Sequence, residues 1–321
     1  MSIVVTGGAG FIGSCIVRKL NDMGIEDIYI VDNVNTSEKW MNLRNKKYIR
    51  YFHKDEFLGE LPSLSGITHI IHMGACSATT ELDFDYLYKN NYLYSIALWE
   101  YCAKKQISFL YASSAATYGG GEEGFDDKMD INRLMPLNRY GYSKQIFDQW
   151  AEKQTERPSQ VIGMKFFNVY GPNEYAKGRM ASMIYHGYKQ VKETNCIKLF
   201  KSHKEGYEDG GQLRDFVYVK DICDVIAYFI EHPQINGLFN LGTGHAESFR
   251  VLAESVFEAL GLTPNIEYIP MPEDLRGKYQ YFTEADMTKL HDTGYDRQFY
   301  DLKSGAIDYV QNYLDKEFKV W

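Results

Sequence analysis

Residues Val4–Gly13 read VVTGGAGFIG, and this stretch decides the fold class. The β-branched run before the glycines is typical of a short strand, and the residues that follow, to about Met23, have a helical pattern. Gly7, Gly10 and Gly13 give the pattern GxxGxxG between them. Glycines let the backbone turn tightly and approach a pyrophosphate, while the start of the next helix supplies unpaired N–H donors. The stretch therefore predicts a strand, a glycine loop and a helix that together bind a dinucleotide.

Strand-like and helix-like segments alternate through the first half of the chain. Further strands are predicted at residues 27–31, 68–72, 108–112 and 160–167, and helical patterns lie around residues 85–105 and from about residue 140. This alternation indicates an α/β fold with a doubly wound parallel sheet and helices on both faces. The sequence predicts a dinucleotide-binding domain of residues 1–167 plus about 214–243. A smaller, interleaved C-terminal substrate lobe of about residues 168–213 plus 244–321 completes the chain.

Composition and charge exclude several classes of protein. The net charge of −8 over 321 residues argues against nucleic acid and anionic membranes as partners. The five cysteines form no CxxC pair, so no metal site is supported and free thiols in a reducing compartment are favoured. No apolar run approaches the roughly 20 residues of a membrane span, and Met1 leads into a strand without a basic leader. We therefore expect a cytoplasmic protein that binds small molecules.

Asp32 is the expected partner of the glycine loop. It follows the predicted strand at residues 27–31, where a carboxylate accepts hydrogen bonds from an adenosine ribose, as in NAD binding. Lys39 and Lys54 follow closely among other cations, and a 2′-phosphate, as in NADP, requires such cations. A solvated basic face explains most of these cations equally well. The sequence therefore leaves the choice between NAD and NADP open.

Tyr140 and Lys144 form a Tyr-x-x-x-Lys pair on the helix predicted from residue 140. Residues four apart share a helix face, so the ammonium, together with a positively charged nicotinamide, is expected to lower the pKa of the phenol and make it a base near neutral pH. Three other matches, Tyr101–Lys105, Tyr185–Lys189 and Tyr188–Lys192, are explained by chance in a tyrosine-rich chain. Ser114 singles out Tyr140, because a hydroxyl just past the strand at residues 108–112 points into the ligand crevice of a parallel sheet.

The segments TGGAGFIG, SSAATYG and YGYSK together resemble the extended short-chain dehydrogenase/reductase family, which has a Rossmann-like fold. The segments HMGACSATTE, FNVYGPNE, AKGRMAS and FNLGTGHAESF extend the resemblance nearly end to end, to the branch of heptose 6-epimerases that act on ADP-heptose. This resemblance implies oxidation at C6 to a ketone, a turn of the intermediate, and return of the hydride to the opposite face. It also implies one NADP or NAD per subunit, retained through turnover, and a homo-oligomer, in this branch a pentamer.

The same resemblance carries individual roles over to this chain. It assigns one acid/base group to Tyr140 and the other to Lys177, which on its own would be interpreted as a surface lysine. The cofactor contacts carried over are Gly7, Gly10, Phe11, Ile12, Gly13, Asp32, Asn33, Lys39, Lys54, Gly74, Ala75, Cys76, Ser77, Asn90, Tyr140, Lys144, Val169 and Lys177. The substrate contacts carried over are Ser114, Asn168, Arg179, His186, Phe200, Arg214 and Tyr279. Met73, Arg179, His245 and the long loop at residues 202–212 depart from the pattern of the branch.

Two alternatives remain. The first is another nucleotide-sugar epimerase or a 4,6-dehydratase of the same family. A dehydratase needs an acidic pair beside the active hydroxyl, where Ala115 and Ala116 stand here, and a C4 epimerase does not need Lys177 as a second base. The second is a dinucleotide-sensing protein without turnover, which predicts loss of the catalytic set. Ser114, Tyr140 and Lys144 are all present.

Overall fold

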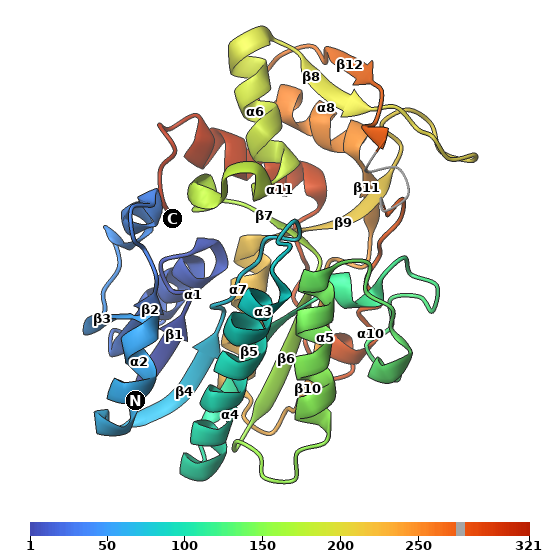
Figure 1. The fold of residues 1–321 in the computed structure, drawn as a ribbon. Coiled ribbons are helices and arrows are strands. Elements are labelled where there is room, and N and C mark those ends of the chain that lie inside the picture. The colour runs from blue at the N-terminus through green and yellow to red at the C-terminus, as the bar shows by residue number, and fades with distance from the viewer. Residues whose placement is uncertain (274–279) are drawn as a thin grey trace.

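The computed structural model describes residues 1–273 and 280–321, and its lower part is built on one large sheet (Figure 1). This sheet has seven strands in the order β10-β6-β5-β4-β1-β2-β3, and every neighbouring pair is parallel. The strands are β1 (Ser2–Thr6), β2 (Ile28–Asp32), β3 (Arg50–His53), β4 (Ile67–His72), β5 (Ser108–Ser114), β6 (Val161–Phe166) and β10 (Gly237–Leu241). The predicted α/β fold with a parallel sheet is confirmed.

Different helices cover the two faces of this sheet. Ile3 and Val5 of β1 belong to one core cluster with α1 and α7, whereas Val4 belongs to a second cluster with α2, α4 and α5. These helices are α1 (Phe11–Asp22), α7 (Val219–Glu231), α2 (Lys54–Glu60), α4 (Tyr94–Lys105) and α5 (Arg139–Glu152). Successive side chains of a strand point to opposite faces of the sheet. The sequence of a strand that is buried on both faces is therefore a continuous apolar run. This is why the run before the glycines predicted a central strand of a doubly wound sheet.

The helical pattern predicted around residues 85–105 is interrupted by a wider turn. It consists of α3 (Phe84–Leu87), a π-helical segment η3 (Tyr88–Leu93) and α4. Such π-helical turns are frequent at functional sites because they shift the side chains that follow. Here the turn contains Asn91, which is buried and reaches the loop after β4.

The upper part in Figure 1 contains short strands and helices. A three-stranded sheet has the order β11-β9-β7, and β12 pairs with β8. The elements are β7 (Asn168–Tyr170), α6 (Met183–Thr194), β8 (Ile197–Phe200), β9 (Leu213–Tyr218), β11 (Ala246–Ser248), α8 (Phe249–Ala259), β12 (Ile266–Ile269) and α11 (Leu302–Tyr309). Helix α10 (Thr288–His291) lies in the lower part instead, where it contacts β10. The segment predicted to return to the dinucleotide-binding domain at residue 214 begins with β9, which pairs with β7 and β11 instead of joining the large sheet. The division of the chain into two lobes stays a prediction.

Short helical turns connect these elements. They are η1 (Glu38–Leu43), η2 (Leu61–Ser63), η4 (Ala115–Tyr118), η5 (Ile131–Arg133), η6 (Tyr175–Met180) and η7 (Val310–Leu314). Of these, η4 directly follows β5, and η6 follows β7 after four residues. Both turns carry side chains used below.

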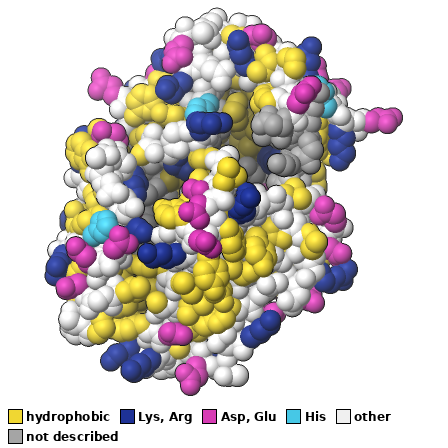
Figure 2. Space-filling model, in the orientation of Figure 1, with side chains coloured by type: hydrophobic (Ala, Val, Ile, Leu, Met, Phe, Trp, Pro, Cys, Tyr) yellow, Lys and Arg dark blue, Asp and Glu magenta, His cyan; other side chains and the backbone are white. Residues whose placement is uncertain are grey.

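On the surface, Figure 2 shows hydrophobic side chains gathered over the lower half of this face, where α3 and α5 lie in Figure 1. Exposed aromatic and aliphatic side chains of α3, α5 and the adjoining η3 include Tyr86, Tyr88, Leu93 and Tyr142. Lysines, arginines and acidic residues are interspersed over the same face (Figure 2). None of the helices within the described residues has the length and apolar character of a membrane span.

Candidate active site

A cavity of about 740 Å³ lies where the glycine loop meets the ends of β4, β5 and β6. Its wall includes every residue that the sequence analysis assigned to the cofactor: Gly7, Gly10, Phe11, Ile12, Gly13, Asp32, Asn33, Lys39, Lys54, Gly74, Ala75, Cys76, Ser77, Asn90, Tyr140, Lys144, Val169 and Lys177. The carboxyl ends of parallel strands meet at one edge of the sheet, which is where open α/β sheets bind ligands. The structure thus brings together side chains from the first half of the chain and from η6.

The glycine loop leaves no room for side chains. A Cβ atom on Gly13 would lie 2.1 Å from the carbonyl oxygen of Gly7, and one on Gly7 would lie 2.8 Å from the backbone nitrogen of Gly74. Gly7 also has a positive φ of 66°, a conformation that favours glycine. Helix α1 begins at Phe11, and Gly10 at its N-cap has no side chain that competes for the first N–H donors. The loop therefore fits a pyrophosphate held against the helix N-terminus.

Asp32 accepts three hydrogen bonds from within the chain. Its Oδ2 accepts a hydrogen bond from the backbone N–H of Ala9 at 2.9 Å. Its Oδ1 accepts from the N–H of Asn33 at 2.7 Å and from the Lys39 ammonium at 2.6 Å. Lys54 donates to Asn90 at 2.7 Å from the other side of this end of the cavity. Lys39 neutralises the carboxylate of Asp32, and Lys54 adds a further ammonium. The adenosine end of the cavity therefore offers positive charge, and Asp32 is an acceptor for a ribose hydroxyl.

We expect Lys39→Met to weaken NADP binding more than NAD binding, raising the Kd for NADP about 10-fold or more, because a 2′-phosphate would lose a charge-assisted hydrogen bond. Titration of the apoprotein with each nucleotide, followed by tryptophan fluorescence, measures both constants. Lys47→Met is the matched control, since Lys47 belongs to the same basic run and pairs with Glu26 on the surface. Equal changes in the two Kd values for Lys39→Met would show that Lys39 contacts no 2′-phosphate.

Asn91 is a site residue that the sequence analysis missed. Its side-chain oxygen accepts from the N–H of Cys76 at 2.8 Å, and its amide donates to the Cys76 carbonyl at 2.9 Å and to Ser143 Oγ at 3.0 Å. It therefore ties the loop after β4 to α5. Its neighbour Asn90, which was predicted, lines the cavity, whereas Asn91 is buried and acts through Cys76. The wider turn of η3 rotates the two asparagines differently from a regular helix, and no local sequence signal reports this. Cys76, like the other four cysteines, is a free thiol, as predicted.

Ser114, Tyr140 and Lys144 meet at the centre of the cavity wall. Helix α5 begins next to the end of β5 because Asn138 caps it, accepting from the N–H of Gly141 at 2.8 Å. Gly141 allows close approach, since a Cβ there would lie 2.6 Å from the carbonyl oxygen of Ala116. Tyr140 hydrogen-bonds with Ser114, and the Lys144 ammonium donates to the carbonyl of Ala112 at 2.9 Å.

The chain without a cofactor gives the starting protonation of this pair. Burial lowers the pKa of Lys144 to about 8. Burial also raises the pKa of Tyr140, against a lowering effect of the Ser114 hydrogen bond, because the desolvation of the phenolate outweighs its neighbours. The expected lowering of the phenol pKa includes the charge of the nicotinamide and stays a prediction. Such a lowering requires a further positive charge, which an oxidised nicotinamide carries.

Lys177 enters the same cavity from η6. Its ammonium lies 5.2 Å from the centroid of the Phe11 ring, at the start of α1. Burial lowers the pKa of Lys177, and the neighbouring Glu174 carboxylate opposes this. Glu174 is itself buried and accepts from the backbone N–H and the hydroxyl of Ser182, both at 2.6 Å. The carboxylate thereby joins the two ends of the segment that carries Lys177.

The residues assigned to the substrate fall into two groups. Ser114 and Asn168 line the cavity. Within the described residues, the cavity wall does not include Arg179, His186, Phe200 or Arg214, and Tyr279 lies outside the described residues. Arg214 is buried directly behind the wall, where it donates to the carbonyl of Gln280 and lies 5.8 Å from the ring centroid of Phe249. The roles of all seven stay predictions.

Comparison with known proteins agrees with this geometry. Residues 3–242 match the model of the NAD dependent epimerase/dehydratase family. An ADP-L-glycero-D-manno-heptose-6-epimerase of Fusobacterium nucleatum is 52% identical, with 98% of each chain covered. One of Nitratidesulfovibrio vulgaris is also 52% identical, with 97% of each covered. Among solved structures, the enzyme of that name from Helicobacter pylori is 28% identical, with a TM-score of 0.82 and 97% and 95% of the two chains covered. This chain belongs to the NAD dependent epimerase/dehydratase family.

Proposed function

We propose that this enzyme converts ADP-D-glycero-D-manno-heptose to ADP-L-glycero-D-manno-heptose by epimerisation at C6, a step in making the lipopolysaccharide core precursor. The observation that carries the proposal is that two candidate acid/base groups, Tyr140 and Lys177, line the same cavity as the glycine loop. They come from separate elements, α5 and η6. An inversion needs one such group for each face of the reacting carbon. The names of the relatives that cover nearly the whole chain support the choice of substrate.

NADP or NAD, one per subunit and retained through turnover, would be held by the glycine loop, Asp32, Lys39 and the loop after β4. When bound, such a cofactor would supply reversible hydride transfer at C6. Tyr140 removes the proton of the C6 hydroxyl, and Ser114 hydrogen-bonds the same oxygen. After the ketone has turned in the cavity, Lys177 supplies the proton to its oxygen as the hydride returns. The substrate regains a hydride and a proton, so no net oxidation occurs. Tyr140 then releases its proton to solvent and Lys177 takes one up, which restores the enzyme for the next turnover in the same direction.

The test has two parts. Denaturing the purified protein and identifying the released nucleotide should yield NADP or NAD, because a self-recycling reaction works best with a retained cofactor. Incubation with ADP-D-glycero-D-manno-heptose should then give the L-glycero epimer, resolved by chromatography or by NMR of the C6 proton. UDP-glucose is the competing substrate of choice, since a UDP-glucose 4-epimerase from Thermus thermophilus shares this fold with a TM-score of 0.79. Faster turnover of UDP-glucose, or no conversion of the heptose, would contradict the proposal.

We also place the enzyme in the cytoplasm and expect it to act as a homo-oligomer, as the family resemblance implies. The free cysteines support a reducing compartment. The exposed hydrophobic side chains over α3 and α5, including Tyr86, Tyr88 and Tyr142, support burial against another copy of the chain. The pentamer stays a prediction.

A further inference from the structure

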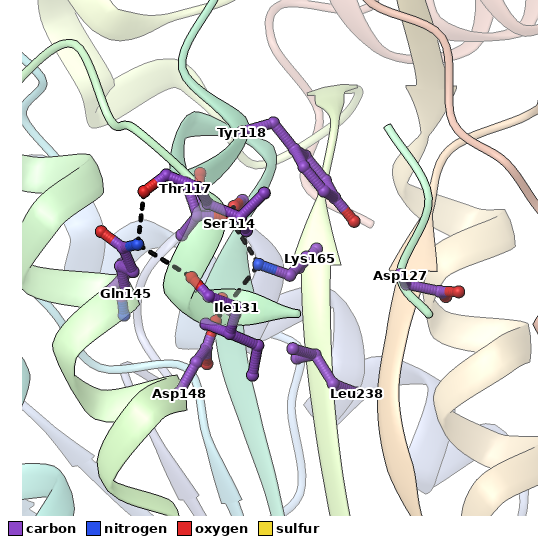
Figure 3. Close-up of polar contacts among 12 residues, drawn as sticks. Ser114, Thr117, Tyr118, Asp127, Ile131, Gln145, Asp148, Lys165 and Leu238 are labelled. Carbon is purple, nitrogen blue, oxygen red and sulfur yellow. Dashed lines mark hydrogen bonds and ion pairs between the residues drawn. The ribbon is translucent and has the colours of Figure 1, made fainter. Parts of the chain in front are cut away.

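A buried ion pair lies directly behind the active-site strand. Asp148 of α5 and Lys165 of β6 are 3.3 Å apart, and their side chains are 0% and 2% exposed. Figure 3 shows Lys165 reaching from β6 toward α5 and toward the turn that holds Thr117. Taking two charges out of water costs more than a well-packed apolar pair of the same size. The pair therefore calls for an explanation other than stability.

Asp148 connects the helix of Tyr140 and Lys144 to the strand of Ser114. Its two carboxylate oxygens accept hydrogen bonds from Tyr111 Oη at 3.1 Å and from Ser113 Oγ at 2.6 Å, in addition to Lys165. Both donors are on β5, and Ser113 directly precedes Ser114. On α5, Asp148 lies one turn after Lys144 and on the same face. A single carboxylate thus sets how α5 docks against β5 and β6.

The ammonium of Lys165 directs the hydroxyl of Thr117. Lys165 donates to Thr117 Oγ1 at 2.5 Å, and Thr117 donates to the carbonyl oxygen of Ser114 at 2.8 Å. An ammonium can only donate, so the Thr117 hydroxyl must accept from it and turn its own proton to Ser114. Ser114 Oγ in turn accepts from the N–H of Ala116 at 3.1 Å. The hydroxyl proton of Ser114 is thereby left to point toward Tyr140 and the cavity.

We propose that Asp148, Lys165 and Thr117 form a buried positioning unit that holds Ser114 and Lys144 in place for the reaction. Of the measurements that test this inference, only kcat depends on the proposed function. None of the three residues lines the cavity, so each acts through another residue. The electrostatics agree, because the Asp148 charge favours the protonated form of Lys144. The other groups that face Lys144 are Cys76, from the loop after β4, and His72, on β4.

The mildest test removes one hydroxyl. Thr117→Val keeps the shape of the side chain and should lower kcat by about 10-fold or more with little change in KM, because a misplaced catalytic group slows the chemistry more than it weakens binding. Thr117→Ser should restore kcat. Ser255→Ala is the matched control, since Ser255 is a buried hydroxyl that bonds a carbonyl within α8, away from the cavity. A kcat for Thr117→Val equal to that of the wild type would overturn the proposal.

Asp148→Asn leaves Lys165 buried without a counter-charge and can fail to fold, so the second test replaces the pair together. Asp148→Leu combined with Lys165→Met should keep a cooperative thermal transition, yet lose kcat and shift the titration of Lys144 to lower pH. The titration is followed by NMR of ¹³C-labelled lysine and needs no substrate, so it separates this inference from the proposed function. If the wild type does not convert the heptose, the proposed function fails, and the Lys144 titration alone decides the inference. A folded double variant with an unchanged Lys144 titration, or with full kcat where the wild type is active, would show that the pair is only structural.

Discussion

Tyr140→Phe is expected to lower the kcat for interconversion of the ADP-heptose epimers by about 10²–10⁴-fold, the range that a general acid/base contributes. The phenol hydrogen-bonds with Ser114 and lies one helical turn before Lys144, so its removal takes away the proton acceptor while the neighbouring groups stay in place. Phenylalanine fills the same space, and the Kd for the cofactor should therefore change little. Initial rates in both directions, with the cofactor content determined for each preparation, measure the effect.

Tyr142→Phe is the control for this prediction. Tyr142 is on the same helix but is 48% exposed and stacks on Phe84 at 5.6 Å between ring centroids. It should keep the rate of the wild type. If Tyr140→Phe kept the rate within about 10-fold of the wild type, the loss would be smaller than removal of a general acid/base causes. The assignment of Tyr140 as an acid/base catalyst would then be wrong.

Lys177→Met is expected to reduce kcat by a similar factor of about 10²–10⁴, because the second face of the reacting carbon loses its proton donor. Oxidation of the substrate on the first face should survive, so reduced cofactor and ketone should accumulate to at most one equivalent per subunit. Absorbance of the reduced nicotinamide in a single-turnover experiment detects this. Lys189→Met serves as control, since Lys189 also ends a Tyr-x-x-x-Lys match but lies 5.8 Å from the Tyr185 ring on α6, outside the cavity.

The pH profile gives this prediction a second readout. The active enzyme needs one proton shared between Tyr140 and Lys177, so kcat/KM should be bell-shaped, with the same profile in both directions. Burial lowers the pKa of Lys177 and raises that of Tyr140. Lys177 therefore loses its proton first, and activity should rise as the pH passes upward through its lowered pKa. Lys177→Met should lose this acid limb. A retained acid limb, or a near-normal rate, would contradict the two-base mechanism.

Much of the lower part of the fold could be predicted because its signals are local. Ile3, Val4 and Val5, in the strand before the glycine loop, are apolar at three successive positions, since β1 is buried on both faces. The strand predicted at residues 108–112 and the helix predicted from about residue 140 correspond to β5 (Ser108–Ser114) and α5 (Arg139–Glu152). The short strands β3, β8 and β12 were not predicted, because four residues carry too little periodicity to identify a strand. Strand β9 begins where the sequence predicted a return to the dinucleotide-binding domain, but its sheet was not predicted, since strand pairing depends on residues far away in the chain.

The predicted residues of the candidate site also differ in how far local sequence could place them. Every predicted cofactor contact lines the cavity, because those residues follow strands whose carboxyl ends must meet at one edge. Of the predicted substrate contacts within the described residues, only Ser114 and Asn168 do so, because residues of the upper lobe reach the cavity through packing that no local pattern reports. Arg214 shows the difference: a guanidinium suits a diphosphate, yet in the structure it lies behind Phe249 and Gln280.

The sequence by itself determined the dinucleotide loop around Gly7, Gly10 and Gly13, the parallel sheet, and the pairing of Tyr140 with Lys144, since each depends on backbone conformation or on side-chain spacing within one element. Only the tertiary structure decided that Lys39 neutralises Asp32, that Lys177 reaches the Phe11 ring, and that Asp148 and Lys165 pair behind Ser114. These contacts set the charge of the site and the pKa values of its groups. Those properties arise from burial and from neighbours on other elements, which exist only when the chain is folded.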